Sequence, residues 1–447
     1  MRPQMADAKA PGGGVLRASG LVGAARVATM FLGLVINMAL ARLLPLDTLG
    51  SFFLLASLVQ VAALLAMAGT THSAVPLVAQ ALGGGLDAGG VRPVLRGMGV
   101  YIGIVLLAVS VIGLAQFDRV AAFAGVDGAG LLLAVLVLLW LGARTCGQAI
   151  AHGLRAMGRV GLFGLFETFL YNLLLAMALL GLLVLGGSPG LIAVTELAAG
   201  AAVLAGLAAL VPMRRETATL PERPGVSLAP VVRMSLPLWL LVAANAALVE
   251  AHLWISGLMG SPESAALFGA ALRVARLVAL PLLAVNLALG PVVARLWRQG
   301  DLAGLQALLG RSAAAVLAVS ILLLAALVLG GPGLLILLFG EAFGPAWPAL
   351  LILLAGQALN AATGSPLLVM TATEAQRPAM VVALVSGAVG LALSLSLAAQ
   401  DPLRGVAFGA AVAVALQNLL ALGYCRWWLG LRTQPTLVAL RRQEASP

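Results

Sequence analysis

The sequence predicts an all-α polytopic membrane protein, with twelve transmembrane helices arranged as two parallel-repeat six-helix bundles around a central cavity. Hydrophobic residues make up 62% of the 447 residues and charged residues only 9%, whereas soluble domains carry about 25% charged residues. Apolar runs that are long enough to cross a bilayer, which takes about 20 helical residues, recur along the whole chain. The 53 glycines suit close packing between membrane helices.

Polar, Gly-rich or Pro-rich stretches divide the apolar sequence into twelve candidate helices. Pro45 and Asp47 separate the first two, and the later boundaries likewise contain glycine, proline or charged residues. Each run approaches or exceeds the length that spans a membrane. In chain order, the candidate helices are 16–44, 51–80, 94–115, 129–150, 161–185, 190–211, 231–258, 265–286 (extending as far as 296), 311–329, 346–370, 379–399 and 405–428.

The charges of the loops predict the orientation of these helices. If both termini lie on one side of the membrane, most loop arginines fall on that side. The opposite loops then hold only Arg119 and Arg404 as basic residues, together with acids such as Asp118, Glu341 and Asp401. Cytoplasmic loops are enriched in Lys and Arg, so both termini are predicted to be cytoplasmic.

A Pro-rich, charged loop follows the sixth candidate helix and predicts a boundary between two halves. Pro76 and Pro291 occupy equivalent positions in these halves, and Gly190 and Gly405 are separated by the same distance in sequence. Halves that each begin and end inside form a parallel repeat, with the substrate site between them. The predicted parts are a flexible cytoplasmic N-terminus (1–15), an N-terminal six-helix bundle (16–211), a cytoplasmic linker (212–230), a C-terminal six-helix bundle (231–428) and a cytoplasmic tail (429–447).

Two arginines interrupt the eighth candidate helix. Arg273 and Arg276 lie three residues apart in an apolar run, so they share one helical face. An arginine at the bilayer centre costs roughly 3 kcal/mol on insertion scales. That face is therefore predicted to meet a carboxylate or a water-filled cavity, which makes both arginines candidate substrate-binding residues.

The first candidate helix carries a similar polar stripe. Arg26, Thr29, Gly33 and Asn37 follow one another at helical spacing. Arg26 lies near the predicted cytoplasmic end, where it either reaches the headgroups or lines the cavity. The small and polar character of the stripe favours the cavity, so Arg26 and Asn37 are further candidate substrate-binding residues.

Other polar residues within the apolar runs have alternative interpretations. Arg144 and Glu167 lie at matching depth on neighbouring candidate helices, which predicts a structural ion pair because intramembrane charges tend to pair. On the seventh candidate helix, Asn245, Glu250 and His252 are candidate ion-coupling residues. Glu250 lies at the depth of Arg273, and that pairing leaves Arg276 without an acidic partner in the bilayer. His252 either relays protons or is a hydrogen-bonded packing residue.

The sequence also excludes several classes of function. The net charge of +10 is spread over many short loops and forms no single patch for nucleic acid. We find no P-loop motif for ATP and no His/Cys cluster for a metal. Neither an enzymatic activity nor a cofactor is therefore expected.

Parts of the sequence resemble a known family. The stretch 33–45 (GLVINMALARLLP), followed by LGSF at 49–52, is similar to the polysaccharide transporter or O-antigen (Wzx-like) flippase family. That family belongs to the multidrug/oligosaccharidyl-lipid/polysaccharide exporter superfamily. A second likeness covers LLFGEAF at 337–343 and the run 350–364.

This resemblance implies a flippase of the bacterial inner membrane, which moves an isoprenoid-diphosphate-linked oligosaccharide from the cytoplasmic to the periplasmic leaflet for surface polysaccharide and lipopolysaccharide assembly. It implies alternating access between two rocking bundles, in contact with membrane lipids and with the polymerase or glycosyltransferases of the same pathway. In the related lipid II flippases, arginines on the first and eighth helices line the cavity and meet the diphosphate. By helix, Arg26, Arg273 and Arg276 correspond to them.

Two alternatives remain open from the sequence. One is a Na⁺- or H⁺-coupled multidrug exporter of the same superfamily, which would need cavity carboxylates for cationic drugs. The other is a non-transporting membrane scaffold, which would need no charge in the cavity. The sequence leaves open the sugar, the lipid carrier and the coupling ion.

Overall fold

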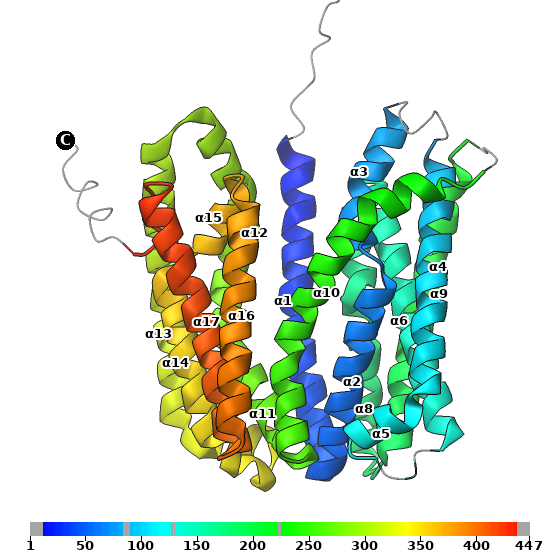
Figure 1. Cartoon of the computed structure of the whole chain (residues 1–447), viewed down its shortest axis with the longest axis vertical. Helices are drawn as coiled ribbons and strands as arrows, with labels where there is room; N and C mark the ends of the chain where they lie inside the picture. Colours follow the sequence, from blue (N-terminus) through cyan, green and yellow to red (C-terminus); the bar gives the residue numbers. More distant parts are fainter. Residues whose placement is uncertain (1–11, 84–89, 127, 129, 222–224, 436–447) are drawn as a thin grey trace, which may run out of the picture.

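Figure 1 shows the computed structural model, in which long helices run roughly parallel to the longest axis of the molecule. The structure describes residues 12–83, 90–126, 128, 130–221 and 225–435. Every regular element within these ranges is a helix, so the predicted all-α fold class is confirmed.

The described residues of the first half form nine α-helices and one π-helical turn. Those of the second half form eight α-helices and two 3₁₀ turns. The first set is α1 (Gly12–Leu43), α2 (Leu46–Ala66), α3 (Thr70–Leu82), α4 (Val91–Ala115), α5 (Phe117–Phe123), α6 (Leu131–Ala156), α7 (Val160–Gly164), η1 (Leu165–Phe169), α8 (Leu170–Val184) and α9 (Leu191–Ala218). The second set is α10 (Leu228–Met259), α11 (Pro262–Arg276), η2 (Leu277–Ala279), α12 (Leu280–Gln299), α13 (Leu302–Phe339), η3 (Glu341–Ala346), α14 (Trp347–Thr363), α15 (Pro366–Ala372), α16 (Gln376–Ala398) and α17 (Pro402–Trp427).

Eleven helical spans among the described residues are long and apolar enough to cross a membrane. Helix α10 lies where the seventh candidate helix was expected and brings the number of described spans to twelve. It is 32 residues long, although only Ala246–Met259 forms its described apolar part. The chain is thus a multi-pass membrane protein, as its hydropathy predicts.

Several candidate helices that were expected to be continuous are broken. The second divides into α2 and α3 at Ala68 and Gly69, which both have positive φ angles. The eighth divides at η2, directly after Arg276. Breaks in these corresponding helices fit the predicted repeat of the two halves. The tenth divides at Gly364, whose φ of 72° favours glycine.

The connection between the two halves is shorter than the predicted linker 212–230. Helix α9 continues through Pro212 to Ala218, and α10 begins at Leu228. Residues 222–224 of that linker lie outside the described residues, as do 1–11 of the predicted N-terminus and 436–447 of the predicted tail.

Buried apolar side chains form one core across both bundles at the end that carries α5 and α11, which is the lower end in Figure 1. This core joins Phe52 of α2, Phe268 of α11 and Phe339 of α13. At the opposite end, where α1 begins and α17 ends, two separate cores replace it, one around Leu77 and one around Leu309. Apart from α10, whose first turns join the core around Leu77, the two bundles therefore share a core at one end only.

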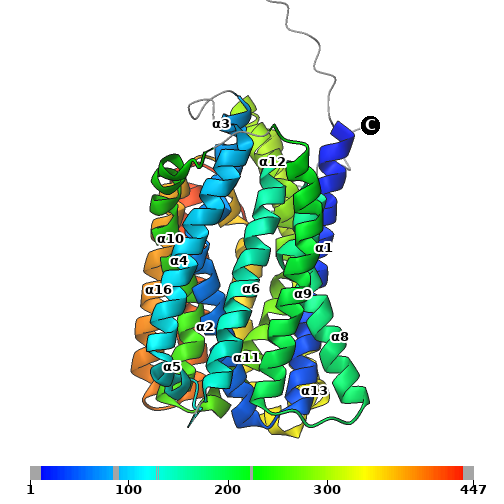
Figure 2. The same ribbon diagram turned by 90° about the vertical axis from the view of Figure 1, so that its right-hand side faces the viewer.

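Helix α10 belongs to both bundles. Near its first turns, Ser235 Oγ lies 2.6 Å from Ser73 Oγ of α3, and Trp239 Nε1 donates to Leu65 O of α2 at 2.8 Å. Near its other end, His252 bonds to α16. Figure 2 shows the helices of the first bundle from the side, with α4 in front of α2.

Small residues allow the two bundles to approach each other at the end with the common core, which we call the closed end. A Cβ on Gly50 of α2 would lie 1.7 Å from the carbonyl oxygen of Pro262 in α11. A hydrogen bond adds to this contact, because Arg42 Nη2 of α1 donates to Leu337 O of α13 at 2.6 Å. The closed end therefore depends on backbone contact between helices of different bundles.

We predict that Gly50→Ala lowers the stability of the protein by about 1–3 kcal/mol, because the added methyl group overpacks the contact between α2 and α11. Thermal unfolding of the purified protein in detergent checks this. Gly99→Ala is the matched control, since a Cβ on Gly99 meets no atom within 4 Å. Equal melting temperatures for the two variants would contradict the predicted contact.

Candidate functional site

Three adjoining cavities run from the first bundle to the second. The N-terminal cavity is lined by helices of the first bundle and Arg273, the C-terminal cavity by helices of the second bundle, and the central cavity by both. The N-terminal cavity has about 210 Å³, the central cavity about 240 Å³ and the C-terminal cavity about 180 Å³. Phe53, Gln60 and Arg273 line both the N-terminal and the central cavity. Leu272 and Arg276 line both the central and the C-terminal cavity. The three cavities thus form a row whose dividing walls carry the two arginines.

The last turn of α11 positions both arginines. Its N-terminus is capped by Ser261, whose side chain accepts a hydrogen bond from Ser264 N. At the other end the helix tightens into the 3₁₀ turn η2 immediately after Arg276. The sequence prediction that Arg273 and Arg276 share a face is consistent with both lining the central cavity.

Arg273 lies against an aromatic ring from the other bundle. Its guanidinium carbon is 3.9 Å from the centroid of the Phe53 ring on α2. Gly269, one turn earlier on α11, makes room for this contact, because a Cβ there would lie 2.6 Å from Arg273 Nη1 and 2.9 Å from the Phe53 ring. The charge is thereby stabilised by a cation–π interaction instead of by a direct ion pair.

Arg144 of α6 has the same type of contact in the N-terminal cavity. Its guanidinium carbon is 4.1 Å from the centroid of the Tyr171 ring on α8. The predicted ion pair with Glu167 is not formed among the contacts of the described residues. Glu167 lies instead in the π-helical turn η1, just before Tyr171. Equal depth in the membrane therefore did not place the two charges side by side.

Glu250 of α10 lines the central cavity together with Arg273 and Arg276. Within the described part of the chain it makes no direct ion pair with either arginine, so the expected Glu250–Arg273 pair is not formed. The sequence left Arg276 without an acidic partner in the bilayer. In the structure, however, Glu250 lines the same cavity as Arg276. Arg276 is exposed although it lies between the bundles, because its side chain borders open space.

His252 of α10 is buried and borders the C-terminal cavity. Its Nδ1 atom lies 2.9 Å from Ser394 Oγ of α16. Ser394 Oγ in turn donates to Val406 O of α17 at 3.4 Å. His252 thus links three helices. Asn245 lies on the same helix, but its side chain is outside the described residues.

The two candidates on α1 lie apart from each other. Asn37 lines the N-terminal cavity, and its Nδ2 atom donates to Gly33 O of its own helix. Arg26 is exposed and does not belong to the described lining of the three cavities. The structure therefore brings Asn37, but not Arg26, together with Arg273.

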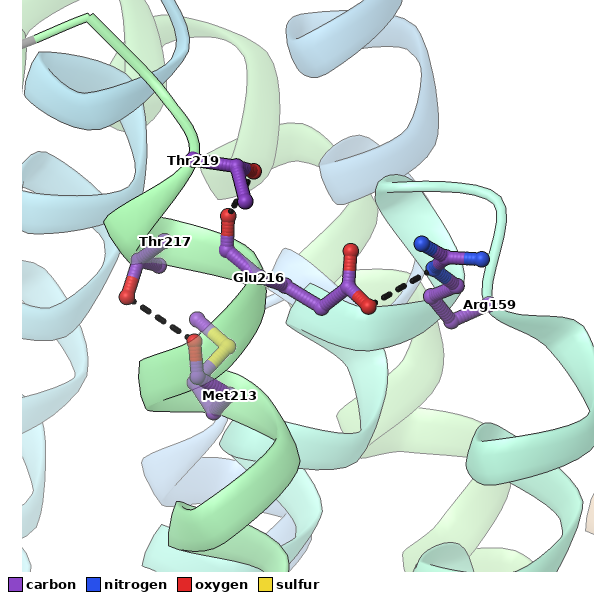
Figure 3. Close-up of polar contacts among 5 residues, drawn as sticks. All are labelled: Arg159, Met213, Glu216, Thr217 and Thr219. Carbon is purple, nitrogen blue, oxygen red and sulfur yellow. Dashed lines mark hydrogen bonds and ion pairs between the residues drawn. The ribbon is translucent and has the colours of Figure 1, made fainter.

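Arg26 lies instead beside a lateral groove of about 880 Å³, which Ala25 and Ala28 of α1 line together with residues of α7 and η1. Figure 3 shows the ion pair at this groove, where Arg159 Nε lies 2.9 Å from Glu216 Oε1 of α9. The groove is otherwise mostly apolar. It shares no lining residue with the row of cavities.

Sequence reasoning missed four glutamines that line the cavities. Gln60 and Gln148 line the N-terminal cavity, whereas Gln357 and Gln417 line the C-terminal cavity. Their signal was present, since each is an uncharged polar residue within an apolar run, and such residues tend to face a bundle interior.

Comparisons with known proteins identify the fold. No family model and no curated protein matches the chain. Solved structures match over almost the whole chain. An inward-facing multidrug resistance MATE family transporter of the MOP superfamily aligns with a TM-score of 0.65 and 14% identity, over 94% of this chain and 96% of that one. The lipid II flippase MurJ, in an inward closed conformation, aligns with a TM-score of 0.68 and 11% identity, over 91% and 87%. A MOP superfamily transporter from Pyrococcus furiosus aligns with a TM-score of 0.63 and 15% identity, over 93% and 95%. The chain therefore has the fold of these transporters.

We predict that Phe53→Leu destabilises the protein by about 1–2 kcal/mol, because the Arg273 guanidinium loses its aromatic partner in a desolvated place. Thermal unfolding measures the loss. Phe31→Leu is the control, since Phe31 is 52% exposed and Phe53 only 2%.

A double-mutant cycle separates this interaction from simple packing. In an Arg273→Met background, the cost of Phe53→Leu should shrink by the cation–π energy. An unchanged cost in that background would mean that the ring acts through packing alone.

Proposed function

We propose that the chain is a flippase that moves an anionic, isoprenoid-diphosphate-linked oligosaccharide from the cytoplasmic to the periplasmic leaflet by alternating access. The observation that carries this proposal is the charge of the cavities. Three arginines, Arg144, Arg273 and Arg276, line the row of cavities, whereas Glu250 is the carboxylate among the described lining residues. A lining of this sign favours an anion.

The geometry of the arginines also suits phosphate. Arg144 and Arg273 each place the guanidinium carbon over the face of an aromatic ring. A ring binds through its face and occupies none of the N–H donors along the guanidinium edge with a hydrogen-bond acceptor. Such an edge binds two phosphate oxygens at once. The two arginines on either side of the N-terminal cavity would hold a diphosphate between the bundles.

The other parts of the substrate have separate places in this proposal. The lateral groove beside Arg26 takes the isoprenoid chain, because it is large, mostly apolar and lined by Leu162, Leu165 and Phe169. The sugars occupy the space toward the end where the apolar core divides into two. The row of cavities, with volumes of about 180–240 Å³ each, holds the diphosphate.

The name of one structural neighbour supports a lipid substrate, because that neighbour is a lipid II flippase. For the Pyrococcus furiosus neighbour, the reverse polarity of the binding pocket suggests a different function, so the polarity of a pocket in this fold varies. The arginines of the present cavities favour an anion over a cationic drug. Pathway polymerases or glycosyltransferases remain proposed partners.

Orientation supplies a driving force. With cytoplasmic termini, as the loop charges predict, the packed end of the molecule faces the periplasm and the divided end faces the cytoplasm. The membrane potential, negative inside, favours outward movement of an anion by about 2.3 kcal/mol per charge per 100 mV. Uniport would then suffice. Coupling to Na⁺ or H⁺ through Asn245, Glu250 or His252 is the alternative.

A second candidate function is an exporter of cationic drugs. The observation that favours it is Glu250, which borders the central cavity, and the MATE neighbours are multidrug transporters. Against it, the arginines that share this cavity would repel a cation. The role of Glu250 therefore distinguishes the two functions.

We predict that Arg273→Ala and Arg276→Ala each reduce polysaccharide export about 10- to 100-fold, since a charge-assisted hydrogen bond contributes about 1.5–3 kcal/mol. Export is measured as surface polysaccharide in a deletion strain that carries each variant, with membrane abundance checked by immunoblotting.

Arg404→Ala is the matched control, because Arg404 is exposed and pairs with Asp401 away from the cavities. It should leave export unchanged. Normal export by the Arg273 and Arg276 variants at normal abundance would refute the diphosphate role, and it is also the result expected of a non-transporting scaffold.

We also predict that Glu250→Gln strengthens binding of a soluble diphosphate probe, farnesyl diphosphate, by up to about ten-fold, because it removes a negative charge beside two arginines. Titration calorimetry on the purified protein measures this affinity. A drug exporter would behave in the opposite way: the variant would bind the probe no better, and it would lose drug resistance in the host.

A further inference from the structure

Beside Arg276, the C-terminal cavity contains hydrogen-bonding groups that the proposed diphosphate contacts do not use. Its polar lining consists of His252 from α10, Arg276 from α11, Gln357 from α14 and Gln417 from α17. None of its described lining residues is an aspartate or a glutamate. Apolar side chains such as Phe268 and Leu353 complete the wall. Four separate helices thus direct polar groups into one small space.

Gln357 presents its amide N–H groups to this cavity. The side chain is only 9% exposed, and its Oε1 atom already accepts a hydrogen bond from Asn360 Nδ2 at 3.1 Å. Its Nε2 atom has no partner among the hydrogen bonds of the described residues. This nitrogen is not one of the fully buried unpartnered atoms, and Gln357 lines the cavity. Its N–H groups are therefore available to a ligand in the cavity.

His252 offers an acceptor on the same cavity. It is 7% exposed. Ser394 Oγ donates to Val406 O, so the Nδ1–H group of His252 is the donor in its contact with Ser394 Oγ. In the neutral ring, Nε2 then carries no proton and accepts. The cavity thus combines several donors, one cationic group and one acceptor.

We propose that the C-terminal cavity binds a phosphate group. Its unprotonated oxygens accept hydrogen bonds from the Arg276 guanidinium and from the amides of Gln357 and Gln417, and its P–OH group donates to His252 Nε2. Arginine suits such an oxyanion because it donates two parallel hydrogen bonds. A halide ion offers no proton to His252, and a neutral sugar leaves the charge of Arg276 unmatched.

The size of the cavity agrees with this ligand. A volume of about 180 Å³ exceeds that of several water molecules, which occupy about 30 Å³ each in the liquid. A phosphate group and accompanying water fit within it. Arg276 borders the central cavity as well, so the phosphate group lies beside the row through which the proposed substrate passes.

The phosphate group has two possible sources. It is either free inorganic phosphate or the terminal phosphate of an isoprenoid diphosphate that carries no sugar. In the second case the inference rests on the proposed function, with the lipid carrier as the ligand. Both sources offer a P–OH group near neutral pH, whereas the sugar-linked diphosphate does not, and competition between soluble probes separates them.

Titration calorimetry on the purified full-length protein in nanodiscs, near neutral pH, tests the site with inorganic phosphate as the probe. We expect Gln357→Leu and His252→Phe to weaken phosphate binding at least ten-fold. Sulfate, which carries no proton at this pH, should bind the unaltered protein several-fold more weakly than phosphate. Gln400→Leu is the control, because Gln400 is exposed at the end of α16, and it should bind phosphate as the unaltered protein does.

Gln417→Leu keeps the test decisive if the more buried variants do not fold, because Gln417 is only half-buried. It should also weaken phosphate binding. The proposal is overturned if the unaltered protein does not bind phosphate, if the folded cavity variants bind it as tightly as the control, or if sulfate binds equally well. Retained phosphate binding by these variants, together with loss in Arg144→Ala, would place the anion in the N-terminal cavity instead.

Farnesyl diphosphate then identifies the source. If it displaces phosphate from the unaltered protein, the cavity takes the terminal phosphate of an isoprenoid diphosphate. If phosphate binds unchanged in its presence, the ligand is the free ion. The export defect of Arg273→Ala is a separate measurement, so failure of the phosphate site and failure of the flippase function are distinguishable.

Discussion

Contact between the two bundles at one end of the molecule determines the rest of the structure. Hydrocarbon offers little hydrophobic drive for helices to associate, so close packing of small residues holds this end together, as at Gly50 and Pro262. That contact fixes α2 against α11 and thereby places Phe53 beneath Arg273. At the other end no common core joins the bundles. The site exists because the bundles meet at one end and separate at the other.

The arginines that line the cavities are stabilised by aromatic contacts and by open space instead of by ion pairs with carboxylates. Arg144 and Arg273 rest on aromatic faces, while Arg276 borders open space. Glu250 is close enough to lower the local potential without forming a direct ion pair with either arginine. Direct pairing would have neutralised the arginines within the protein. The arrangement instead leaves guanidinium edges available for a ligand, and this availability distinguishes a binding site from a structural ion pair.

Much of the architecture could be predicted from the sequence, because a membrane span is a local property of about 20 residues. The shared face of Arg273 and Arg276 was predictable for the same reason. The partners of these charges were not, since they depend on how separate helices rotate about their axes. Equal depth in the bilayer suggested ion pairs of Arg144 with Glu167 and of Arg273 with Glu250. In the structure, both arginines contact aromatic rings instead. The breaks at Gly69 and η2 depend on tertiary contacts that hydropathy does not record.

Helix α10 has a mechanical consequence for any motion of the bundles. Ser235 and Trp239 fasten its first part to α3 and α2, while His252 fastens its last part to α16. Rocking of one bundle against the other must then be absorbed as bending within the stretch between Trp239 and His252. This stretch follows Pro237, which lacks the N–H of a regular helical hydrogen bond. The helix that bends during such a motion is therefore the helix that carries Glu250 and His252. Bending of α10 and binding of a ligand in the cavities would thus act on the same residues.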